Sequence, residues 1–340
     1  MMYSLFRPIL FSLDPEAAHA AAFAALDLQA QLGLAKCWRG SVPDTEPVHL
    51  MGLTFPNRVG LAAGLDKDAW HLSGLAQLGF GFIEVGTLTP KPQPGNPKPR
   101  MFRLPEHEAL INRLGFNNGG VDAALPRLRA RRVDVPVGVN IGKNATTPIE
   151  RAADDYLAAL AAVYATADYI TINISSPNTR NLRDLQAPDS VSALISTIAR
   201  EGRRLARLTG HARPIAVKIA PDIDPAAIND VVNAIVEAGA DAIISSNTTI
   251  RRDGVTGHVY ANETGGLSGA PLTALADQVL KQVVKAVAGR VPVIGVGGIR
   301  SVEDARRKLD LGADLLQVYT GLLYRGPGFV GDLLRGLAGR

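Results

Sequence analysis

The sequence predicts an α/β fold, a (β/α)8 TIM barrel with an N-terminal helical hairpin extension. Two observations support this prediction. Eight short apolar runs rich in β-branched residues recur along the chain, and helical patterns separate them. Strands that alternate with helices form a parallel sheet, and eight such units are the number that closes this barrel. A doubly wound open sheet is the alternative, which the regular succession of eight units disfavours.

The eight strands are expected in order along the chain, and each is a short apolar run that leads into small or polar residues. Such runs are typical of parallel strands, because both of their faces are buried. Their predicted bounds are Arg58–Leu65, Phe82–Thr89, Val135–Gly142, Tyr169–Ser176, Pro214–Ala220, Ala242–Thr248, Pro292–Ile299 and Leu315–Gly321.

Helices are expected between the strands, and capping residues mark several of their ends. Asp224 before Pro225 predicts an N-cap followed by proline in the first turn, and Ser301 with Asp304 resembles a capping box. Glycine follows several of the helices, where it ends a helix at low conformational cost. The helical patterns cover Pro148–Thr166, Asp189–Leu208, Pro225–Ala238, Pro271–Ala288 and Ser301–Leu311, and the closing glycines are Gly239, Gly289 and Gly312.

Residues 1–45 are predicted to form a helical extension of the barrel domain, which is expected to cover residues 46–340. Met1–Leu13 and Asp14–Leu34 are expected to be two helices, and Asp14-Pro15 separates them and caps the second. This hairpin either packs on the barrel as plain structure or lies in a membrane interface through its apolar surface.

The sequence gives no sign of export or of a membrane span. Asp14 and Glu16 interrupt the apolar run near the N-terminus, so we do not expect a signal peptide. No run of about 18 uncharged apolar residues occurs, so we do not expect a transmembrane helix.

Composition argues against several function classes. The 340 residues carry a net charge of +4, which favours anionic small molecules or anionic lipid surfaces as partners. The basic cluster Arg127–Arg132 has no interleaved aromatic residues, so we interpret it as a solvated helix face and expect no nucleic acid partner. Cys37 is the only cysteine and the six histidines lack ligand spacing, so neither an internal disulfide nor a metal site is expected.

Three neighbouring strands are expected to place polar side chains inside the barrel. Side chains of a strand alternate between its two faces. If the β-branched residues of each strand face the helices, then Asn140, Asn173 and Lys218 face the interior near the C-terminal ends. Buried amides and an ammonium need partners. We therefore expect a polar ligand there, although a purely structural network is the alternative, and the active sites of such barrels lie at this end.

The last two strands predict a phosphate site. Gly297 and Gly298 lie at the end of the seventh predicted strand, and a helix is expected to begin near Ser301. Backbone N–H groups at a helix N-terminus favour an anion, and this corner of the barrel commonly holds a phosphate. A second glycine-rich loop, Gly265–Gly269, is expected to lie beside it. Glycine also serves ordinary turns, so each loop alone is a weak signal.

Eight segments in order resemble the dihydroorotate dehydrogenase family from end to end. The resemblance is to its membrane-associated, quinone-dependent class, class 2. The segments are AAGLDK (62–67), INRLGFNN (111–118), NIGKN (140–144), INISSPNT (172–179), VKIAPD (217–222), SNTT (246–249), GGLSG (265–269) and GVGGI (295–299).

The resemblance implies FMN across the barrel mouth as the cofactor. Lys218 would stabilise negative charge on the reduced flavin. Ser246 and Thr320 stand where the family also uses threonine and serine, which is a conservative difference. The matching cofactor positions are Ala63, Gly64, Leu65, Asp66, Lys67, Thr87, Asn140, Asn173, Lys218, Ser246, Gly269, Gly298, Tyr319 and Thr320.

The resemblance also implies dihydroorotate as the substrate, orotate as the product and a role in de novo pyrimidine (UMP) biosynthesis. A lysine would meet the substrate carboxylate, and asparagines would supply donors and acceptors for its ring amides. The matching positions are Lys67, Asn112, Arg113, Leu114, Gly115, Phe116, Asn173, Asn178, Asn247 and Thr248.

Ser176 matches the catalytic base of the family. Oxidation removes a proton from one carbon and passes a hydride from its neighbour to FMN. Serine is a weak base, so the proton would have to move on through water or a hydroxyl such as that of Thr179. Ser175 is the rival serine. The soluble class of the family uses cysteine as base, and Cys37 precedes the barrel and cannot align with that position.

The resemblance implies a quinone tunnel in the N-terminal extension, lined by His19, Arg103 and Tyr319. A membrane quinone would be the electron acceptor. The protein would then be a peripheral membrane protein on the cytoplasmic face of the bacterial inner membrane.

Other functions fit parts of the pattern. Lys67 and Lys218 at strand ends would also suit a Schiff-base aldolase. A flavin- or phosphate-binding barrel without turnover is a second alternative, and the same oxidation coupled to NAD or fumarate is a third. The missing cysteine base and the N-terminal extension argue against the third.

Overall fold

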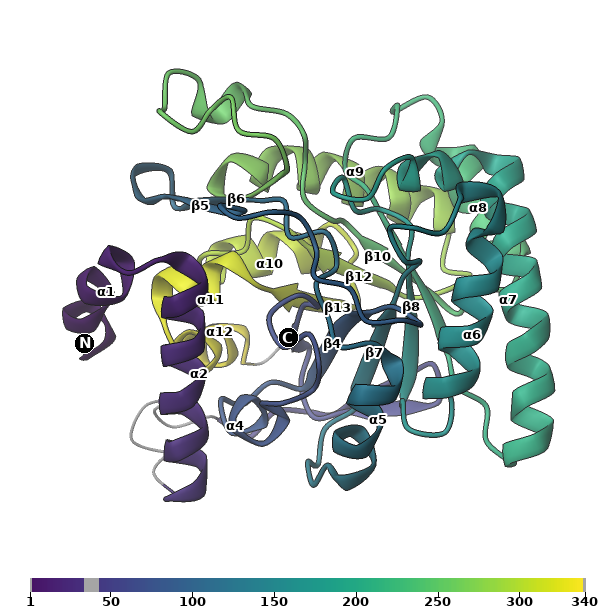
Figure 1. The fold of residues 1–340 in the computed structure, drawn as a ribbon, viewed down its shortest axis with the longest axis horizontal. Helices are drawn as coiled ribbons and strands as arrows, with labels where there is room; N and C mark the ends of the chain where they lie inside the picture. The colour runs from purple at the N-terminus through teal and green to yellow at the C-terminus, as the bar shows by residue number, and fades with distance from the viewer. Residues whose placement is uncertain (1, 34–42, 339–340) are drawn as a thin grey trace.

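The computed structural model describes residues 2–33 and 43–338, which form a closed eight-stranded parallel barrel with helices around it (Figure 1). The last strand pairs with the first, through Val318 and Leu61, so the sheet closes and the open-sheet alternative is wrong. Each strand is shorter than predicted. At β8 and β10, the polar residues beyond the strand end line the mouth instead, among them Ser176, Asn247 and Thr248. The barrel strands are β3 (Val59–Leu61), β4 (Phe82–Leu88), β7 (Val137–Ile141), β8 (Tyr169–Asn173), β9 (Ile215–Ile219), β10 (Ala242–Ser245), β12 (Val293–Val296) and β13 (Leu315–Val318).

The predicted helices are present on the outside of the barrel, and two of them begin about a turn later than predicted. Helix α6 begins at Ala152 rather than at Pro148, after a 3-10 helix at Ile149–Arg151. Helix α8 begins at Ile228, and Asp224 instead accepts the backbone N–H of Ala226 at 3.0 Å in the turn before it. The Ser301 hydroxyl accepts the N–H of Asp304 at 3.2 Å, which confirms that cap. The helices are α4 (Leu72–Ala76), α5 (Val121–Ala130), α6 (Ala152–Val163), α7 (Pro188–Thr209), α8 (Ile228–Glu237), α9 (Thr273–Val287), α10 (Val302–Asp310), α11 (Thr320–Arg325) and α12 (Phe329–Leu337).

Two apolar layers hold the barrel together. The outer layer lies between strands and helices and contains the β-branched residues, including Ile170 and Ile172, that were predicted to face outward. The inner layer fills the lower barrel around Phe82 and Tyr169, whose ring centroids lie 6.4 Å apart. A Cβ at Gly138 would lie 2.1 Å from the Tyr169 ring, so only glycine leaves room for this packing.

The N-terminal residues form the expected helical hairpin at one side of the barrel, drawn in purple in Figure 1. The two helices are α1 (Met2–Ser12) and α2 (Pro15–Gln31), and Asp14 caps the second by accepting the N–H groups of Glu16 and Ala17, both at 3.0 Å. Residues 34–42, with Cys37, lie outside the described residues. Within the described part of the chain, no helix is long and apolar enough to cross a membrane.

Two small antiparallel sheets, which the sequence pattern did not predict, cover the ends of the barrel. Strands β1 (Val48–Leu50) and β2 (Leu53–Phe55) form a hairpin, and Phe55 from it packs on Phe82 inside the barrel. Strands β5 (Met101–Leu104), β6 (Ala109–Asn112) and β11 (Gly266–Gly269) form the second sheet. This sheet joins the predicted glycine-rich loop to a distant segment and brings Asn112 to the mouth.

Candidate active site

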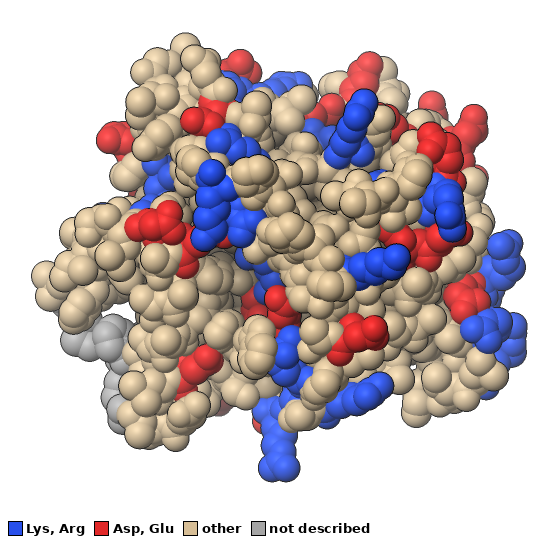
Figure 2. All heavy atoms as spheres, viewed as in Figure 1, with Lys and Arg blue, Asp and Glu red and all other residues tan. Residues whose placement is uncertain are grey.

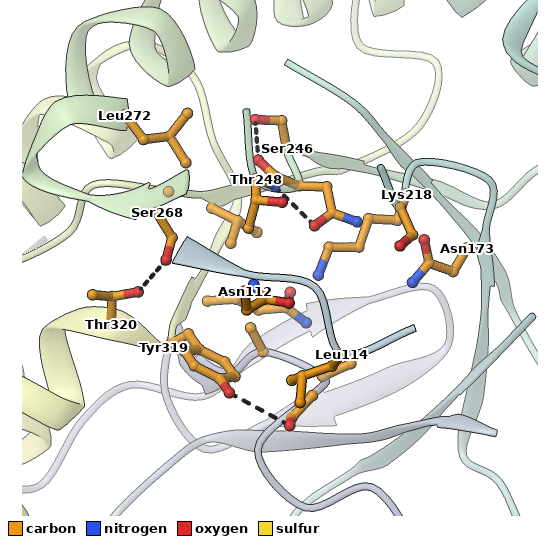
Figure 3. A pocket seen from close by; sticks show the side chains of 18 of the residues that line it. Asn112, Leu114, Asn173, Lys218, Ser246, Thr248, Ser268, Leu272, Tyr319 and Thr320 are labelled. Carbon is orange, nitrogen blue, oxygen red and sulfur yellow. Dashed lines mark hydrogen bonds between the residues drawn. The ribbon is translucent and has the colours of Figure 1, made fainter. Parts of the chain in front are cut away.

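The C-terminal ends of the barrel strands meet in one polar pocket (Figure 3). Lys218 extends its ammonium group toward the middle of this pocket, and Asn173 lies beside it. Of the residues expected at the cofactor and substrate sites, those that line the pocket are Ala63, Gly64, Lys67, Thr87, Asn112, Leu114, Gly115, Phe116, Asn173, Ser176, Asn178, Lys218, Ser246, Asn247, Thr248, Gly269, Gly298, Tyr319 and Thr320.

A buried carboxylate, which sequence reasoning missed, lies beneath the pocket. Glu84 of β4 accepts hydrogen bonds from Asn140 at 2.8 Å, Gln317 at 2.8 Å, Thr171 at 3.0 Å and Tyr169 at 3.1 Å. These donors come from strands β7, β8 and β13. The period of two that places Asn140 inside the barrel also places Glu84 there, so alternation along β4 could have found it.

The interior network continues upward from Glu84 to the pocket wall. Because Asn140 donates its amide nitrogen to Glu84, its oxygen is left to accept from Thr87 at 2.6 Å and from Asn173 at 3.2 Å. Asn173 in turn accepts the Ser175 hydroxyl at 3.1 Å. The orientation of each side-chain amide is therefore fixed by its hydrogen-bond partners in the network.

Two ammonium groups give the pocket a positive potential. Burial lowers the pKa of Lys218, against the raising effect of the Glu84 charge. Burial also lowers the pKa of Lys67, against Glu16. Among the described residues, neither ammonium has an ion-pair partner within 4.0 Å. Lys218 is buried and Lys67 is partly buried, and cations in such positions without ion-pair partners favour an anionic ligand.

The two neighbouring serines have different environments. Ser175 is fully buried, donates to Asn173 and accepts from the Asn247 amide at 2.9 Å. Ser176 instead lines the pocket, and its hydroxyl oxygen accepts the N–H of Asn178 at 3.2 Å. The Thr179 hydroxyl is buried without a partner among the described residues.

An ion pair that was not predicted ties the loops after β8, β9 and β10 together. Arg183 donates to Asp222 at 2.8 Å, to the carbonyl of Ser175 at 2.9 Å and to the carbonyl of Thr248 at 2.9 Å. Asp222 also accepts the Thr249 hydroxyl. This clamp fixes the backbone that carries both serines, and a lone arginine in a loop gives no sequence signal for it.

The predicted phosphate corner has the expected backbone form. Gly297 and Gly298 have φ of 97° and 75°, and a Cβ at Gly298 would lie 2.3 Å from the Thr273 hydroxyl. Gly269 from the second sheet lies in the same wall, as expected for the two glycine-rich loops. The Thr320 and Ser268 hydroxyls bond each other there at 2.8 Å.

Four of the predicted residues lie away from the pocket lining. Asn140 belongs to the network beneath it, and Leu65 is buried in the outer apolar core. Asp66 accepts the N–H groups of Trp70 and His71, at 2.9 and 2.8 Å. Arg113 turns outward to pair with Glu263 at 2.5 Å, so in this structure its guanidinium does not face the pocket.

An apolar cavity of about 470 Å³ lies between the hairpin and the barrel. Tyr319 lines both this cavity and the polar pocket, and His19 and Arg103 line the cavity as well. Burial, with the charges of Lys67 and His71, lowers the pKa of His19 to about 4, so its imidazole is neutral at neutral pH. Arg103 donates to the carbonyls of Leu10 and Leu13 at the turn of the hairpin.

A third, polar cavity of about 450 Å³ adjoins both of the others. It shares Lys67 and Tyr319 with the polar pocket, and His19, Leu65, Met101 and Tyr319 with the apolar cavity. Tyr319 therefore lies where the three cavities meet.

Comparison with known proteins gives a consistent result. The family model described as dihydroorotate dehydrogenase matches residues 47–340. The chain is 54% identical to a dihydroorotate dehydrogenase (quinone) from Thiobacillus denitrificans, over 99% of this chain and 100% of the relative, and 52% identical to one from Chromobacterium violaceum, over 99% and 98%. It is also similar to a crystal structure of DHODH from Eimeria tenella in complex with ferulenol, with a TM-score of 0.85 and 37% identity over 97% of this chain and 93% of that one.

Proposed function

The chain belongs to the dihydroorotate dehydrogenase family, and from this premise we propose that it oxidises dihydroorotate to orotate and passes the electrons to a quinone in pyrimidine biosynthesis. The observation that carries the proposal is the meeting of two unlike cavities at Tyr319. The polar pocket suits an anionic, amide-rich substrate, and the apolar cavity suits a lipid-soluble acceptor.

FMN fits the polar pocket as the cofactor. The amide oxygen of Gln317 is buried in the pocket wall and has no hydrogen-bond partner among the described residues, while the amide nitrogen donates to Glu84. Gly297 and Gly298 allow a phosphate to approach the backbone closely. When bound, FMN supplies the two-electron acceptor for the hydride that leaves the substrate. Lys218 would favour the reduced form by its charge.

The substrate would lie against Asn112, Asn178, Asn247 and Thr248, with its carboxylate near Lys67. Asn178 donates to Asn112 at 3.2 Å, so the two amides form one wall. Ser176, which faces the pocket, would take the proton from carbon, and the unpartnered Thr179 hydroxyl is a candidate to pass it on. A positioned base contributes roughly 10²–10⁴-fold to such a step.

The acceptor would enter through the apolar cavity, whose mouth is at the N-terminal hairpin. Leu5 and Ile9 of α1 are 75% and 62% exposed, and the only charged residue of this helix is Arg7. The surface over α1, at the left of Figure 2, correspondingly has few charged groups. We infer a peripheral attachment of this hairpin to the membrane, on the cytoplasmic face of the inner membrane, with the barrel in water.

The absorbance spectrum of the purified protein tests the proposal. A yellow protein that bleaches under anaerobic conditions with dihydroorotate, and recovers its colour with a quinone, is the expected result. A colourless protein that cannot be reconstituted with FMN would contradict it. Trapping by borohydride with a carbonyl substrate would instead support an aldolase, and bleaching reversed by NAD or fumarate but not by quinone would reassign the acceptor.

A further inference from the structure

The proposed oxidation of dihydroorotate by a quinone needs a proton at the quinone site. The inference that follows from this need rests on the proposed function. Dihydroorotate loses two electrons and two protons, and a quinone gains two of each. One hydrogen leaves the substrate as hydride, which is one proton with two electrons. The other leaves carbon as a proton through Ser176, on the substrate side. One of the two protons that complete the quinol must therefore enter from solvent near the quinone.

The apolar cavity is a poor source of that proton. Its walls are mainly aliphatic and aromatic, and water is sparse in such a space. The polar cavity beside it is lined by charged and hydrogen-bonding groups, and His19 and Tyr319 belong to the walls of both. A proton that reaches the polar cavity is therefore one side chain away from the proposed quinone site.

Two imidazoles line the polar cavity, and both pack against the ring of Phe23. The ring of Phe23 stacks on His71 with centroids 4.1 Å apart, and His19 lies on Phe23 at 4.6 Å. The Nδ1 atom of His71 lies 2.6 Å from the Asp27 carboxylate. Because this carboxylate can only accept, it holds the His71 proton on Nδ1 and leaves Nε2 to exchange protons.

The carboxylates that line this cavity are committed to partners of their own. On α2, Glu16 pairs with Arg100 at 2.8 Å and with Lys98 at 2.9 Å. On the loop between β3 and α4, Asp66 accepts two backbone N–H groups, and Asp68 accepts the N–H of Gly119 at 2.8 Å. Lys67, from the same loop, also faces the substrate pocket. The two histidines are thus the groups best placed to carry protons through the cavity.

We propose that the polar cavity is the proton entry route to the quinone, with His71 as its solvent-side relay and His19 as the group that donates to the quinone oxygen. A proton from water binds Nε2 of His71, passes through water in the cavity to one nitrogen of His19, and the opposite nitrogen of His19 releases its proton. Each imidazole ends neutral. His71 is unchanged, whereas His19 ends in its other tautomer, and exchange of its ring proton with water in the cavity restores the first tautomer before the next transfer. Asp27 is a positioning residue that fixes the tautomer of His71.

Quinone and ferricyanide as alternative acceptors test this proposal, because ferricyanide takes electrons without protons. His71→Gln keeps a side-chain donor for Asp27 but cannot relay a proton. We expect it to slow reoxidation by a short-chain quinone roughly ten- to hundred-fold, and to change reoxidation by ferricyanide, and reduction by dihydroorotate, less than two-fold. Added imidazole should restore much of the rate of reoxidation by quinone.

His211→Gln is the matched control, because His211 is an exposed histidine after α7. This variant should leave every rate unchanged.

A second measurement does not depend on turnover. In FMN-loaded protein without quinone, ¹⁵N NMR of His71 should report the Nδ1–H tautomer, and Asp27→Asn should shift the population toward Nε2–H. Equal slowing of ferricyanide and quinone in His71→Gln would show a packing role and overturn the proposal, and so would an unchanged quinone rate. Failure of dihydroorotate to bleach the wild-type protein would instead overturn the proposed function, so the two failures can be told apart.

Discussion

At the residue scale, Ser175 and Ser176 are adjacent in the chain but have opposite surroundings. Ser175 is held between Asn173 and Asn247 and is fully buried, so its hydroxyl is committed to structure. Ser176 faces the pocket, and its oxygen accepts the N–H of Asn178.

Substituting each serine separates these roles. Ser176→Ala should retain FMN but slow its reduction by dihydroorotate roughly 10²–10⁴-fold, because a positioned base is lost. Ser175→Ala should slow reduction far less and lower stability by about 1 kcal/mol, the usual worth of a buried hydrogen bond. Stopped-flow bleaching and urea unfolding measure the two effects. Near-normal reduction in Ser176→Ala would reassign the base.

At the element scale, helix α1 combines apolar exposure with few contacts to the barrel. Tyr3 donates to the carbonyl of Leu323 at 2.5 Å, and Arg7 donates to the carbonyl of Tyr324 at 3.2 Å. These bonds fix one side of the helix and leave Leu5 and Ile9 on the other side in solvent. An exposed apolar stripe at the mouth of an apolar cavity indicates a lipid-facing surface.

Polar substitution of that stripe tests the membrane assignment without deleting the helix. The double change Leu5→Gln and Ile9→Gln should weaken vesicle binding roughly a hundred-fold or more, and the use of long-tailed quinones with it, because burial of each leucine-sized side chain contributes about 1.5–3 kcal/mol and about 1.4 kcal/mol is a factor of ten. Reduction of FMN by dihydroorotate, and reoxidation by small soluble dyes, should persist.

Leu208→Gln is the matched control, since Leu208 is 69% exposed on α7. It should alter neither vesicle binding nor quinone use. Vesicle sedimentation and rates in liposomes provide the comparison. Unchanged sedimentation of the α1 variant would leave the hairpin as packing alone.

At the scale of the whole molecule, the C-terminal ends of several barrel strands together form the pocket, and no single element could form it alone. Glu84, Asn140 and Lys218 come from three strands, and the Arg183–Asp222 clamp joins loops from two more parts of the chain. A ligand in the pocket would contact side chains from several strands and would rest on this network, so it should stabilise the barrel as a unit.

Removal of FMN should therefore lower the thermal unfolding temperature. Binding to the native state alone adds RT ln(1 + [L]/Kd), which is about 2.7 kcal/mol at a hundred-fold excess over Kd. Titrating FMN into the apoprotein should raise the melting temperature steadily with concentration. Lys218→Met should reduce that rise, whereas Lys281→Met, on the outer helix α9, should not. A melting temperature independent of FMN would argue against the assigned pocket.

Much of this protein can be read from its sequence, because period-two alternation and helix caps are local signals. They predicted the eight strands, the interior positions of Asn140, Asn173 and Lys218, and the Ser301 cap. The cap at Asp224 failed because the chain makes one more turn before α8 begins. Other features depend on residues that lie far apart in the chain. These are the Glu84 network, the sheet that joins β11 to β6, the Asp27–His71 pair and the meeting of three cavities at Tyr319. Only the closure of the barrel and the docking of the hairpin decide such contacts, because burial and distance are properties of the packed molecule rather than of any local segment.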